Sequence, residues 1–300
     1  MERMALEHRS GFACLVGRPN AGKTTLTNAL VGRKIGITST RPQTTRHAIR
    51  GIVHRPDSQL VLVDTPGLHK PRTVLGRRLN DIVRATWSQV DVVAFCVPAD
   101  QKVGPGDRYI AAELAQLRTP IVAVVTKSDL ARRDLVAGQL VATSNLGDFA
   151  EIIPVSAYTG EGVELLSDLL IQRLPPGPAL YPDGQLTDEP ELVLVAEFIR
   201  EAALEGVRDE LPHSLAVTVE EMKAREGRDD LVDIYALLYV ERASQKGIVL
   251  GKNGARIKAV GTAARQQIEA LLGIRVYLDL HVKVLPGWQN DPKHLGRLGF

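Results

Sequence analysis

The chain contains few cysteines, few aromatic residues and no long apolar run. It has two cysteines among 300 residues, Cys14 and Cys96, and 4% of its residues are aromatic. Both cysteines lie in short apolar segments without metal-ligand or disulfide spacing, which predicts buried thiols in a reducing compartment. No run reaches the length of a membrane span, and the first residues lack the apolar stretch of a signal peptide. We therefore expect a cytoplasmic protein without a disulfide framework.

Length and composition favour two domains. A chain of 300 residues exceeds the usual size of one domain, and 44% apolar residues can supply real cores. Alternating strand and helix patterns predict a doubly wound α/β domain over 1–174, with strands near 11–16, 48–54, 60–64, 91–97, 121–126 and 152–155. A segment rich in proline and glycine, 175–190, predicts a linker. Residues 191–300 then form a second, α+β domain.

Residues 17–24 read Gly-Arg-Pro-Asn-Ala-Gly-Lys-Thr and match the phosphate-binding pattern G-x-x-x-x-G-K-[ST]. An apolar run precedes the motif and helical spacing follows it, so we expect a turn between a strand and a helix. Backbone N–H groups in such a turn bind phosphate. Lys23 is expected to reach the β- and γ-phosphates, and Thr24 to ligate Mg²⁺. The other residues expected to contact the nucleotide here are Gly17, Asn20, Ala21, Gly22 and Thr25.

Residues 60–67, Leu-Val-Leu-Val-Asp-Thr-Pro-Gly, place Asp64 at the carboxyl end of a buried strand. Ligands of parallel sheets bind at that end. Asp64 is therefore a candidate Mg²⁺ ligand, and the Gly67 N–H can reach the γ-phosphate. A plain turn explains Asp-x-x-Gly equally well when it stands alone. The polar segment 41–46 offers a further threonine for the metal, and we favour Thr45.

Two segments after later strands resemble the guanine-recognition pair of GTPases, Asn-Lys-x-Asp and Ser-Ala. They are Thr-Lys-Ser-Asp at 126–129 and Ser-Ala at 156–157. The resemblance implies that Asp129 accepts hydrogen bonds from guanine N1–H and the exocyclic amine. It also implies that Lys127 packs over the base and that the Ala157 N–H meets O6, next to Ser156.

Three positions qualify this site. Thr126 stands where the guanine motif usually has Asn, so we expect guanine specificity with modestly lower affinity. Leu68 stands where Ras-like proteins have a water-orienting Gln, which predicts slow hydrolysis that depends on a partner, the backbone or the segment around Thr45. Asn20 either shapes the loop or, as in related GTPases, holds a K⁺ ion beside the phosphates. The candidate catalytic set is Asn20, Lys23, Thr45, Asp64 and Gly67.

The second domain has the predicted element order α-β-β-α-α-β and resembles a type II KH RNA-binding domain. Residues 251–254, Gly-Lys-Asn-Gly, lie between its two consecutive helices. A G-x-x-G loop there clamps about four nucleotides of single-stranded RNA. Residues 242–275 carry seven basic residues and one acidic residue, although residues 181–300 carry 15 basic and 19 acidic residues. A solvated helix face would explain the basic run without the loop. The candidate RNA-binding residues are Lys246, Gly251, Lys252, Asn253, Gly254, Arg256 and Lys258.

Together these motifs resemble the Era family of bacterial GTPases, and the resemblance covers essentially the whole chain. The distinctive matches are 17–23, 43–47, 64–69 and 251–254. The resemblance implies a GTP- and GDP-binding switch with Mg²⁺ that binds the 3′ end of 16S rRNA and acts in assembly of the 30S subunit. It also implies association with the inner face of the cell membrane, for which the sequence shows no anchor. No DNA partner is expected.

Two other classes stay open. One is a P-loop kinase or ATPase that acts on a small molecule, against which Asp129 and the 156–157 pair argue. The other is a signalling GTPase whose second domain binds a protein, against which the 251–254 loop and its basic surroundings argue. In the favoured class, GTP and Mg²⁺ order the segments around Thr45 and Asp64, and hydrolysis releases them.

Overall fold

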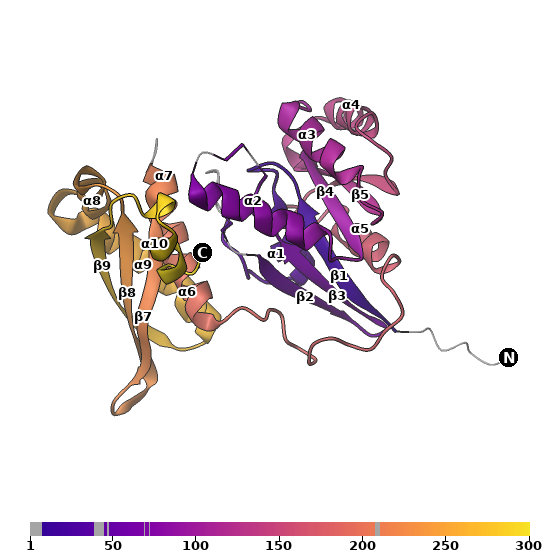
Figure 1. Ribbon diagram of the computed structural model, residues 1–300. Helices are drawn as coiled ribbons and strands as arrows, with labels where there is room; N and C mark the ends of the chain where they lie inside the picture. Colours follow the sequence, from indigo (N-terminus) through magenta and orange to yellow (C-terminus); the bar gives the residue numbers. More distant parts are fainter. Residues whose placement is uncertain (1–7, 39–44, 47, 69, 72, 208–210) are drawn as a thin grey trace. The chain divides into compact units, whose positions relative to one another are not determined.

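The computed structural model describes residues 8–38, 45–46, 48–68, 70–71, 73–207 and 211–300 (Figure 1). Parts of the two motifs at 43–47 and 64–69 therefore lie outside the described residues, namely 43–44, 47 and 69. The described residues pack as two compact units. One lies within residues 1–36, 45–71 and 77–188, and the other within 37–44, 72–76 and 189–300.

The first unit is built on a six-stranded sheet of order β2-β3-β1-β4-β5-β6. Its strands are β1 (Arg9–Val16), β2 (Ile49–Arg55), β3 (Ser58–Asp64), β4 (Val92–Pro98), β5 (Ile121–Thr126) and β6 (Glu151–Val155). Strand β2 pairs antiparallel with β3, and all other neighbours are parallel. Because β1, β3, β4, β5 and β6 share one direction, the segments that follow them begin at the same edge of the sheet.

Helices cover both faces of this sheet. They are α1 (Lys23–Val31), α2 (Val74–Trp87), α3 (Pro105–Leu114), α4 (Arg133–Ser144) and α5 (Val163–Ile171), with a short 3-10 turn η1 (Ser128–Leu130). Alternate residues of β1 enter two different cores, since successive side chains of a strand point to opposite faces. Leu15 belongs to the core that contains side chains of α1 and α5, and Cys14 to the core that contains side chains of α2 and α3. The predicted doubly wound α/β fold and the burial of both cysteines are confirmed.

Most of the segment predicted as a linker lies along the first unit. The Ile52 N–H donates to the Leu186 carbonyl at 2.9 Å, and Gly51 forms an antiparallel bridge with Thr187. The side-chain amide of Gln59 bonds the backbone of residues 180–181. Residues 175–188 thus pack along β2, at the edge of the sheet. Their proline and glycine content predicts irregular backbone correctly, but it does not show whether that backbone is packed or free.

The second unit has a three-stranded sheet of order β7-β8-β9, antiparallel between β7 and β8 and parallel between β8 and β9. Its elements are α6 (Glu191–Leu204), α7 (Leu211–Ser214), β7 (Ala216–Arg225), β8 (Arg228–Val240), α8 (Ala243–Leu250), η2 (Lys252–Gly254), α9 (Ala255–Leu272), β9 (Arg275–Val284), η3 (Trp288–Asn290) and α10 (Pro292–Arg297). The order α6-β7-β8-α8-α9-β9 is that of a type II KH domain and confirms the prediction.

Outside the G-x-x-G loop, which forms the 3-10 turn η2, three short elements of this unit were not predicted: α7, η3 and α10. They are held by one aromatic side chain. Trp288 is fully buried, stacks on Phe300 at 5.8 Å between ring centroids, and donates from Nε1 to the Ser214 carbonyl at 3.1 Å. A buried indole N–H needs such an acceptor, so this contact ties the C-terminal segment to α7.

Candidate nucleotide and RNA sites

The phosphate-binding loop, residues 17–24, joins β1 to α1 as predicted. Asn20 and Gly22 have positive φ angles, +62° and +84°, which turn the backbone into a tight curve. A Cβ on Gly17 would lie 2.6 Å from the carbonyl oxygen of Cys96, so only glycine fits there. Ala21 is buried, whereas Thr25 is exposed in the first turn of α1. The loop therefore has the strand–turn–helix setting that phosphate binding requires.

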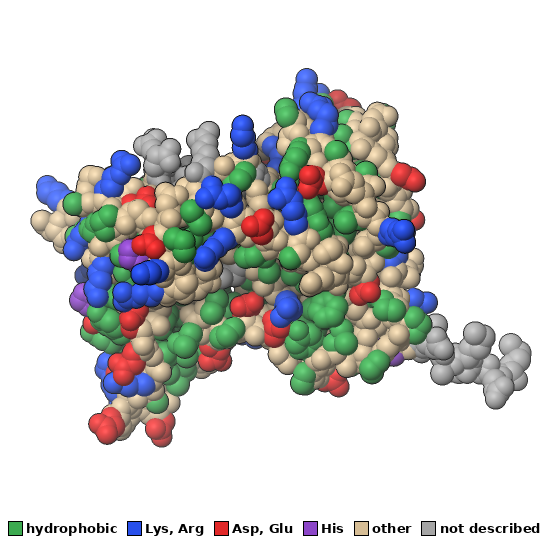
Figure 2. Space-filling view, in the orientation of Figure 1, with side chains coloured by type: hydrophobic (Ala, Val, Ile, Leu, Met, Phe, Trp, Pro, Cys, Tyr) green, Lys and Arg blue, Asp and Glu red, His purple; other side chains and the backbone are tan. Residues whose placement is uncertain are grey.

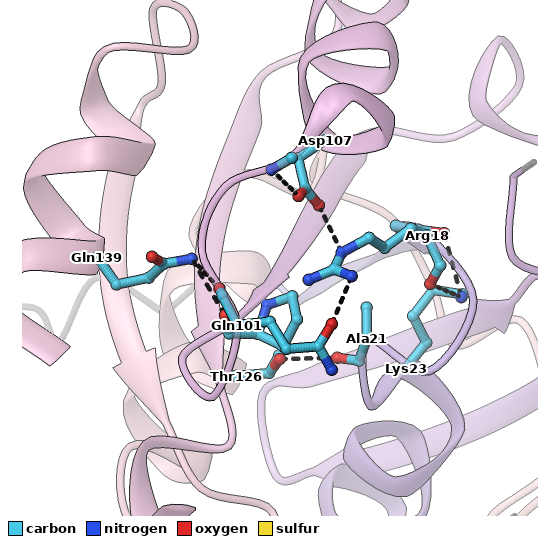
Figure 3. Close-up of polar contacts among 10 residues, drawn as sticks. Arg18, Ala21, Lys23, Gln101, Asp107, Thr126 and Gln139 are labelled. Carbon is cyan, nitrogen blue, oxygen red and sulfur yellow. Dashed lines mark hydrogen bonds and ion pairs between the residues drawn. The ribbon is translucent and has the colours of Figure 1, made fainter. Parts of the chain in front are cut away.

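Lys23 is buried at the mouth of this loop. Its ammonium Nζ donates to the carbonyl oxygens of Gly17 and Arg18, each at 3.3 Å (Figure 3). Burial lowers the pKa of Lys23, and the negative charge of Asp64 opposes that shift. The loop carbonyls thus hold the cation in place beside the backbone that would surround a phosphate.

The three predicted metal ligands converge. The Thr24 hydroxyl donates to Asp64 Oδ2 at 2.5 Å, and the hydroxyl oxygens of Thr24 and Thr45 are 2.7 Å apart. Asp64 is fully buried, and burial raises its pKa from 3.8 to about 6 against the opposing charge of Lys23. Its Oδ1 atom has no hydrogen-bond partner within the described part of the chain. A buried carboxylate oxygen without a partner, beside two hydroxyls, fits a hard divalent cation that prefers oxygen ligands.

The turn after β3 lies against the phosphate loop. A Cβ on Gly67 would stand 2.6 Å from the backbone nitrogen of Pro19. The Leu68 N–H donates to the Gly17 carbonyl at 3.3 Å, and the Leu68 side chain is buried in the core that contains side chains of α2 and α3. Leu68 therefore serves packing at the position where a Gln could orient water.

The base-recognition segments also lie at this edge of the sheet. The Ser156 hydroxyl, fully buried, donates to Asp129 Oδ1 at 2.6 Å and fixes that exposed carboxylate next to Ala157. The Thr126 hydroxyl donates to the Ala21 carbonyl at 2.7 Å (Figure 3). Thr126 thus supports the phosphate loop, although its short side chain replaces only part of an Asn.

Lys127 has a partner that the sequence did not suggest. Its backbone is left-handed, with φ +58°, and its Nζ lies 3.2 Å from Asp100 Oδ2. Asp100 follows β4 and is 27 residues away, so no local spacing signals this ion pair. It ties the Lys127 side chain to the segment that follows β4.

The G-x-x-G loop of the second unit joins α8 to α9. Gly251, Asn253 and Gly254 all have positive φ angles, +71°, +52° and +76°. A Cβ on Gly251 would lie 2.7 Å from the Cβ of Arg256, so the loop needs glycine there. Lys252 and Asn253 are exposed at its tip. This geometry leaves backbone and basic side chains accessible, as a clamp on a phosphate backbone requires.

The other predicted RNA residues differ in exposure. Lys258 is exposed and Lys246 is half-buried. Arg256, whose contact with RNA stays a prediction, donates to the carbonyls of Ala203 at 3.2 Å and Glu205 at 2.6 Å, at the end of α6. Its guanidinium caps the last carbonyls of that helix. Long-range packing of this kind cannot be read from the spacing of residues around the loop.

Charge is distributed unevenly over the second unit. In Figure 2, Lys and Arg side chains gather over the part that carries α8 and β9, whereas Asp and Glu gather toward the β7–β8 hairpin. The G-x-x-G loop follows α8, and residues 242–275 around it carry seven basic residues and one acidic residue. Throughout the described residues, no helix combines the length and apolarity that crossing a membrane needs.

Two family models match the chain. The one described as 50S ribosome-binding GTPase matches residues 12–127, and the one described as KH domain matches residues 210–289. GTPase Era of Mycobacterium avium is 67% identical over 297 residues, which is 98% of this chain and 99% of that protein. GTPase Era of Mycobacterium tuberculosis is 66% identical over 298 residues, with the same two shares.

Two solved structures share the fold over nearly the whole chain. A crystal structure of Era in complex with MgGDPNP and nucleotides 1506–1542 of 16S ribosomal RNA has a TM-score of 0.94 and 34% identity. A crystal structure of an Aquifex aeolicus Era variant bound to GDP·AlF4⁻ has a TM-score of 0.93 and 33% identity. Each covers 97% of this chain and 99% of the other.

Fold and site define a P-loop GTPase joined to a KH domain. The chain belongs to the Era family of GTPases, since identity and coverage extend over both domains. It is an enzyme that hydrolyses GTP.

Proposed function

We propose that this GTPase binds the 3′ end of 16S rRNA through its KH domain, under control of GTP, and acts in assembly of the 30S subunit. The observation that carries the proposal is the exposed loop of Lys252 and Asn253, held between glycines in the positive-φ region. The relative that shares the fold at a TM-score of 0.94 was crystallised with this part of 16S rRNA. RNA is thus the partner that the loop and its surrounding charge fit best.

The phosphate end of the nucleotide is bound by the loop of residues 17–24. Backbone N–H groups of this loop and the N-terminus of α1 surround the phosphates, and the Lys23 ammonium, held by the Gly17 and Arg18 carbonyls, reaches the phosphate oxygens. The Gly67 N–H faces the γ-phosphate. The base end is read by Asp129, which Ser156 orients for the two guanine donors, with Lys127 over the base and the Ala157 N–H at O6.

Mg²⁺ is held by Thr24, Thr45 and Asp64. The ion neutralises charge that develops on the β- and γ-phosphates. The buried Oδ1 of Asp64 supplies an oxygen that no protein group occupies among the described residues. Thr45 and Asp64 come from different segments, which contacts with Mg²⁺ and the γ-phosphate would hold together. Loss of the γ-phosphate would therefore release these segments from each other. This is the proposed origin of the switch.

Hydrolysis needs a positioned water, and Leu68 cannot supply a polar group. We therefore assign water positioning to backbone groups near Gly67 and to the segment around Thr45, with a slow rate in the absence of a partner. Asn20 is the proposed ligand of a K⁺ ion beside the phosphates. Equal turnover in sodium and potassium buffers would rule out the K⁺ site and leave Asn20 as a loop-shaping residue.

The proposed place of action is the cytoplasm, where the 30S subunit is assembled. Peripheral association with the inner face of the cell membrane is a separate proposal that rests on family resemblance alone. Sedimentation with vesicles of anionic and of neutral lipid, at two salt concentrations, tests it. No increase in bound protein over the vesicle-free sample would contradict it.

RNA binding is tested by fluorescence anisotropy with the 16S 3′-end segment, beside an RNA of equal length and permuted sequence. The wild-type chain, loaded with GDPNP, is compared with Lys252→Ala and with Lys293→Ala, a second exposed lysine on α10. We expect the natural sequence to bind more tightly than the permuted one, and Lys252→Ala to lower the salt slope by about one. Equal binding of both RNAs would contradict the proposal and favour a protein partner for this domain.

A further inference from the structure

Arg18 lies within the phosphate loop, yet its side chain contacts a different segment. The guanidinium reaches the segment that leads from β4 into the first turn of α3, where Nε donates to Asp107 Oδ1 at 3.0 Å and Nη1 donates to Gln101 Oε1 at 2.6 Å (Figure 3). The side chain is 22% exposed, whereas Asp107 is fully buried. A charge-assisted pair with a buried carboxylate has little freedom to rearrange.

The Asp107 carboxylate and the backbone of Gln101 are themselves held in place. Asp107 Oδ2 accepts the Gly104 N–H at 2.8 Å and closes the first turn of α3, where an acidic side chain is favoured. The side-chain amide of Gln139, on α4, donates to the carbonyls of Pro98 and Gln101 at 3.1 and 3.0 Å. Residues 98–107 are therefore held by the first turn of α3 and by Gln139 of α4, independently of Arg18.

The same segment is bonded to the guanine end of the site. The Ala99 N–H donates to the Thr126 carbonyl at 2.7 Å, and Asp100 pairs with Lys127 at 3.2 Å. Residues 98–107 thus contact the phosphate loop at one end and the base-recognition segment at the other. No motif in the sequence identifies them, because their contacts are spread over residues far apart in the chain.

The backbone that Arg18 anchors also holds the phosphate-binding lysine. Carbonyl oxygens of Gly17 and Arg18 accept the two hydrogen bonds of the Lys23 ammonium. A shift of this backbone therefore moves Lys23 and the neighbouring N–H groups together. An error of about 1 Å in such a site can cost a hundredfold in rate.

We propose that Arg18 is a positioning residue for GTP binding and hydrolysis, which fixes the phosphate loop on the 98–107 segment without touching the nucleotide. The inference rests on the nucleotide site described above. In this arrangement the 98–107 segment sets the distance between the phosphate and guanine ends. Loss of the Arg18 contacts weakens GDP and GDPNP alike, because the γ-phosphate is not what Arg18 orders.

The test compares Arg18→Gln and Arg18→Lys with Arg84→Gln. Arg84 also pairs with a residue of α3, Glu113, at 3.2 Å, but at the surface and away from the phosphate loop. Dissociation of fluorescent GDP and GDPNP is followed by stopped flow, together with kcat, KM and the melting temperature without nucleotide. We expect Arg18→Gln to release both nucleotides about tenfold faster, which corresponds to 1.4 kcal/mol, and Arg84→Gln to match the wild type.

A double-mutant cycle separates positioning from general stability. The double variant Arg18→Gln with Gln101→Ala is expected to release nucleotide no faster than Arg18→Gln alone. The reason is that each substitution removes the same hydrogen bond, the one between Arg18 and Gln101. Unchanged dissociation in Arg18→Gln despite a lower melting temperature would overturn the proposal and leave a purely structural ion pair. Additive effects in the cycle would overturn it too. A wild-type chain that binds no guanine nucleotide would instead contradict the nucleotide site itself.

Discussion

The hydroxyl of Thr126 donates a 2.7 Å hydrogen bond to the carbonyl oxygen of Ala21, and so joins the base-recognition strand to the phosphate loop. Both groups are buried. The GTPases that this motif resembles usually have Asn at this position, and from the sequence we expect Thr to keep guanine specificity with modestly lower affinity. Through this hydrogen bond Thr126 supports the phosphate loop as an Asn would, and its hydroxyl hydrogen is used for the Ala21 carbonyl.

Thr126→Val is expected to weaken nucleotide binding. The valine keeps the shape but leaves the Ala21 carbonyl buried without its donor, which costs about 1–3 kcal/mol. We expect GDP affinity to fall roughly tenfold, since 1.4 kcal/mol corresponds to a factor of ten. Titration calorimetry measures the affinity, and Thr126→Ser, which keeps a hydroxyl, is the control. Equal affinity of the Val and Ser variants would show that the hydrogen bond is not needed.

Ser156→Ala is expected to reduce guanine specificity. The alanine removes the 2.6 Å hydrogen bond that orients Asp129, and with it the acceptor for the Thr159 N–H. The loss of one such bond to a charged group is worth about 1.5–3 kcal/mol. Competition of GTP against ATP measures the effect, with Ser144→Ala on the exposed side of α4 as control. An unchanged GTP-to-ATP ratio would show that Asp129 needs no support from Ser156.

Asp64→Asn is expected to stabilise the metal-free, nucleotide-free protein while it abolishes Mg²⁺-dependent binding. Burial raises the pKa of Asp64 from 3.8 to about 6, so the ionised carboxylate opposes folding at pH 7. A rise of about two pKa units, at about 1.4 kcal/mol each, predicts a gain on the order of 3 kcal/mol. The attraction to Lys23 is already contained in this pKa and does not offset burial.

The gain in stability of Asp64→Asn over the wild type is expected to shrink as the pH falls. As the pH falls through about 6 toward 3.8, the folded wild type takes up a proton on Asp64 that the unfolded chain does not, and its stability approaches that of the Asn variant. Thermal unfolding in EDTA over this range measures the difference, with Asp134→Asn at the surface as control. A variant less stable than the wild type at pH 7 would refute the pKa argument.

Gly251→Ala is expected to weaken RNA binding about tenfold or more and to leave GTP turnover intact. The glycine has φ +71° and ψ 176°, a region that other residues enter at a cost of about 1–3 kcal/mol. Its Cβ would also stand 2.7 Å from that of Arg256. Gly261→Ala, in the middle of α9 with open space around it, is the matched control. Equal RNA affinity of the Gly251→Ala and Gly261→Ala variants would show that RNA does not bind at the G-x-x-G loop.

Much of this site could be predicted because it depends on local pattern and strand direction. Apolar strands followed by a polar turn place Thr24 and Asp64 at one sheet edge, since parallel strands end there together. Thr45 could be named from its segment, although its place beside Thr24 needed the structure. The G-x-x-G loop was identified in the same way, from two glycines between helical patterns.

The contacts that could not be predicted join residues distant in the chain. Arg256 bonds carbonyls at the end of α6, more than fifty residues earlier, and Asp100 pairs with Lys127. Residues 175–188 are bonded to β2 and to Gln59, although their composition indicates a linker. Such pairs are selected by packing of the folded chain and leave no periodic signal in the sequence.

The central claim is that GTP controls RNA binding, and one comparison tests it directly. The affinity of the 16S 3′-end RNA is measured at fixed salt for the chain loaded with GDPNP and for the chain loaded with GDP. The account predicts tighter binding in the GDPNP form. Equal affinity in the two forms would contradict the switch, and the KH domain would then bind RNA without reference to the nucleotide.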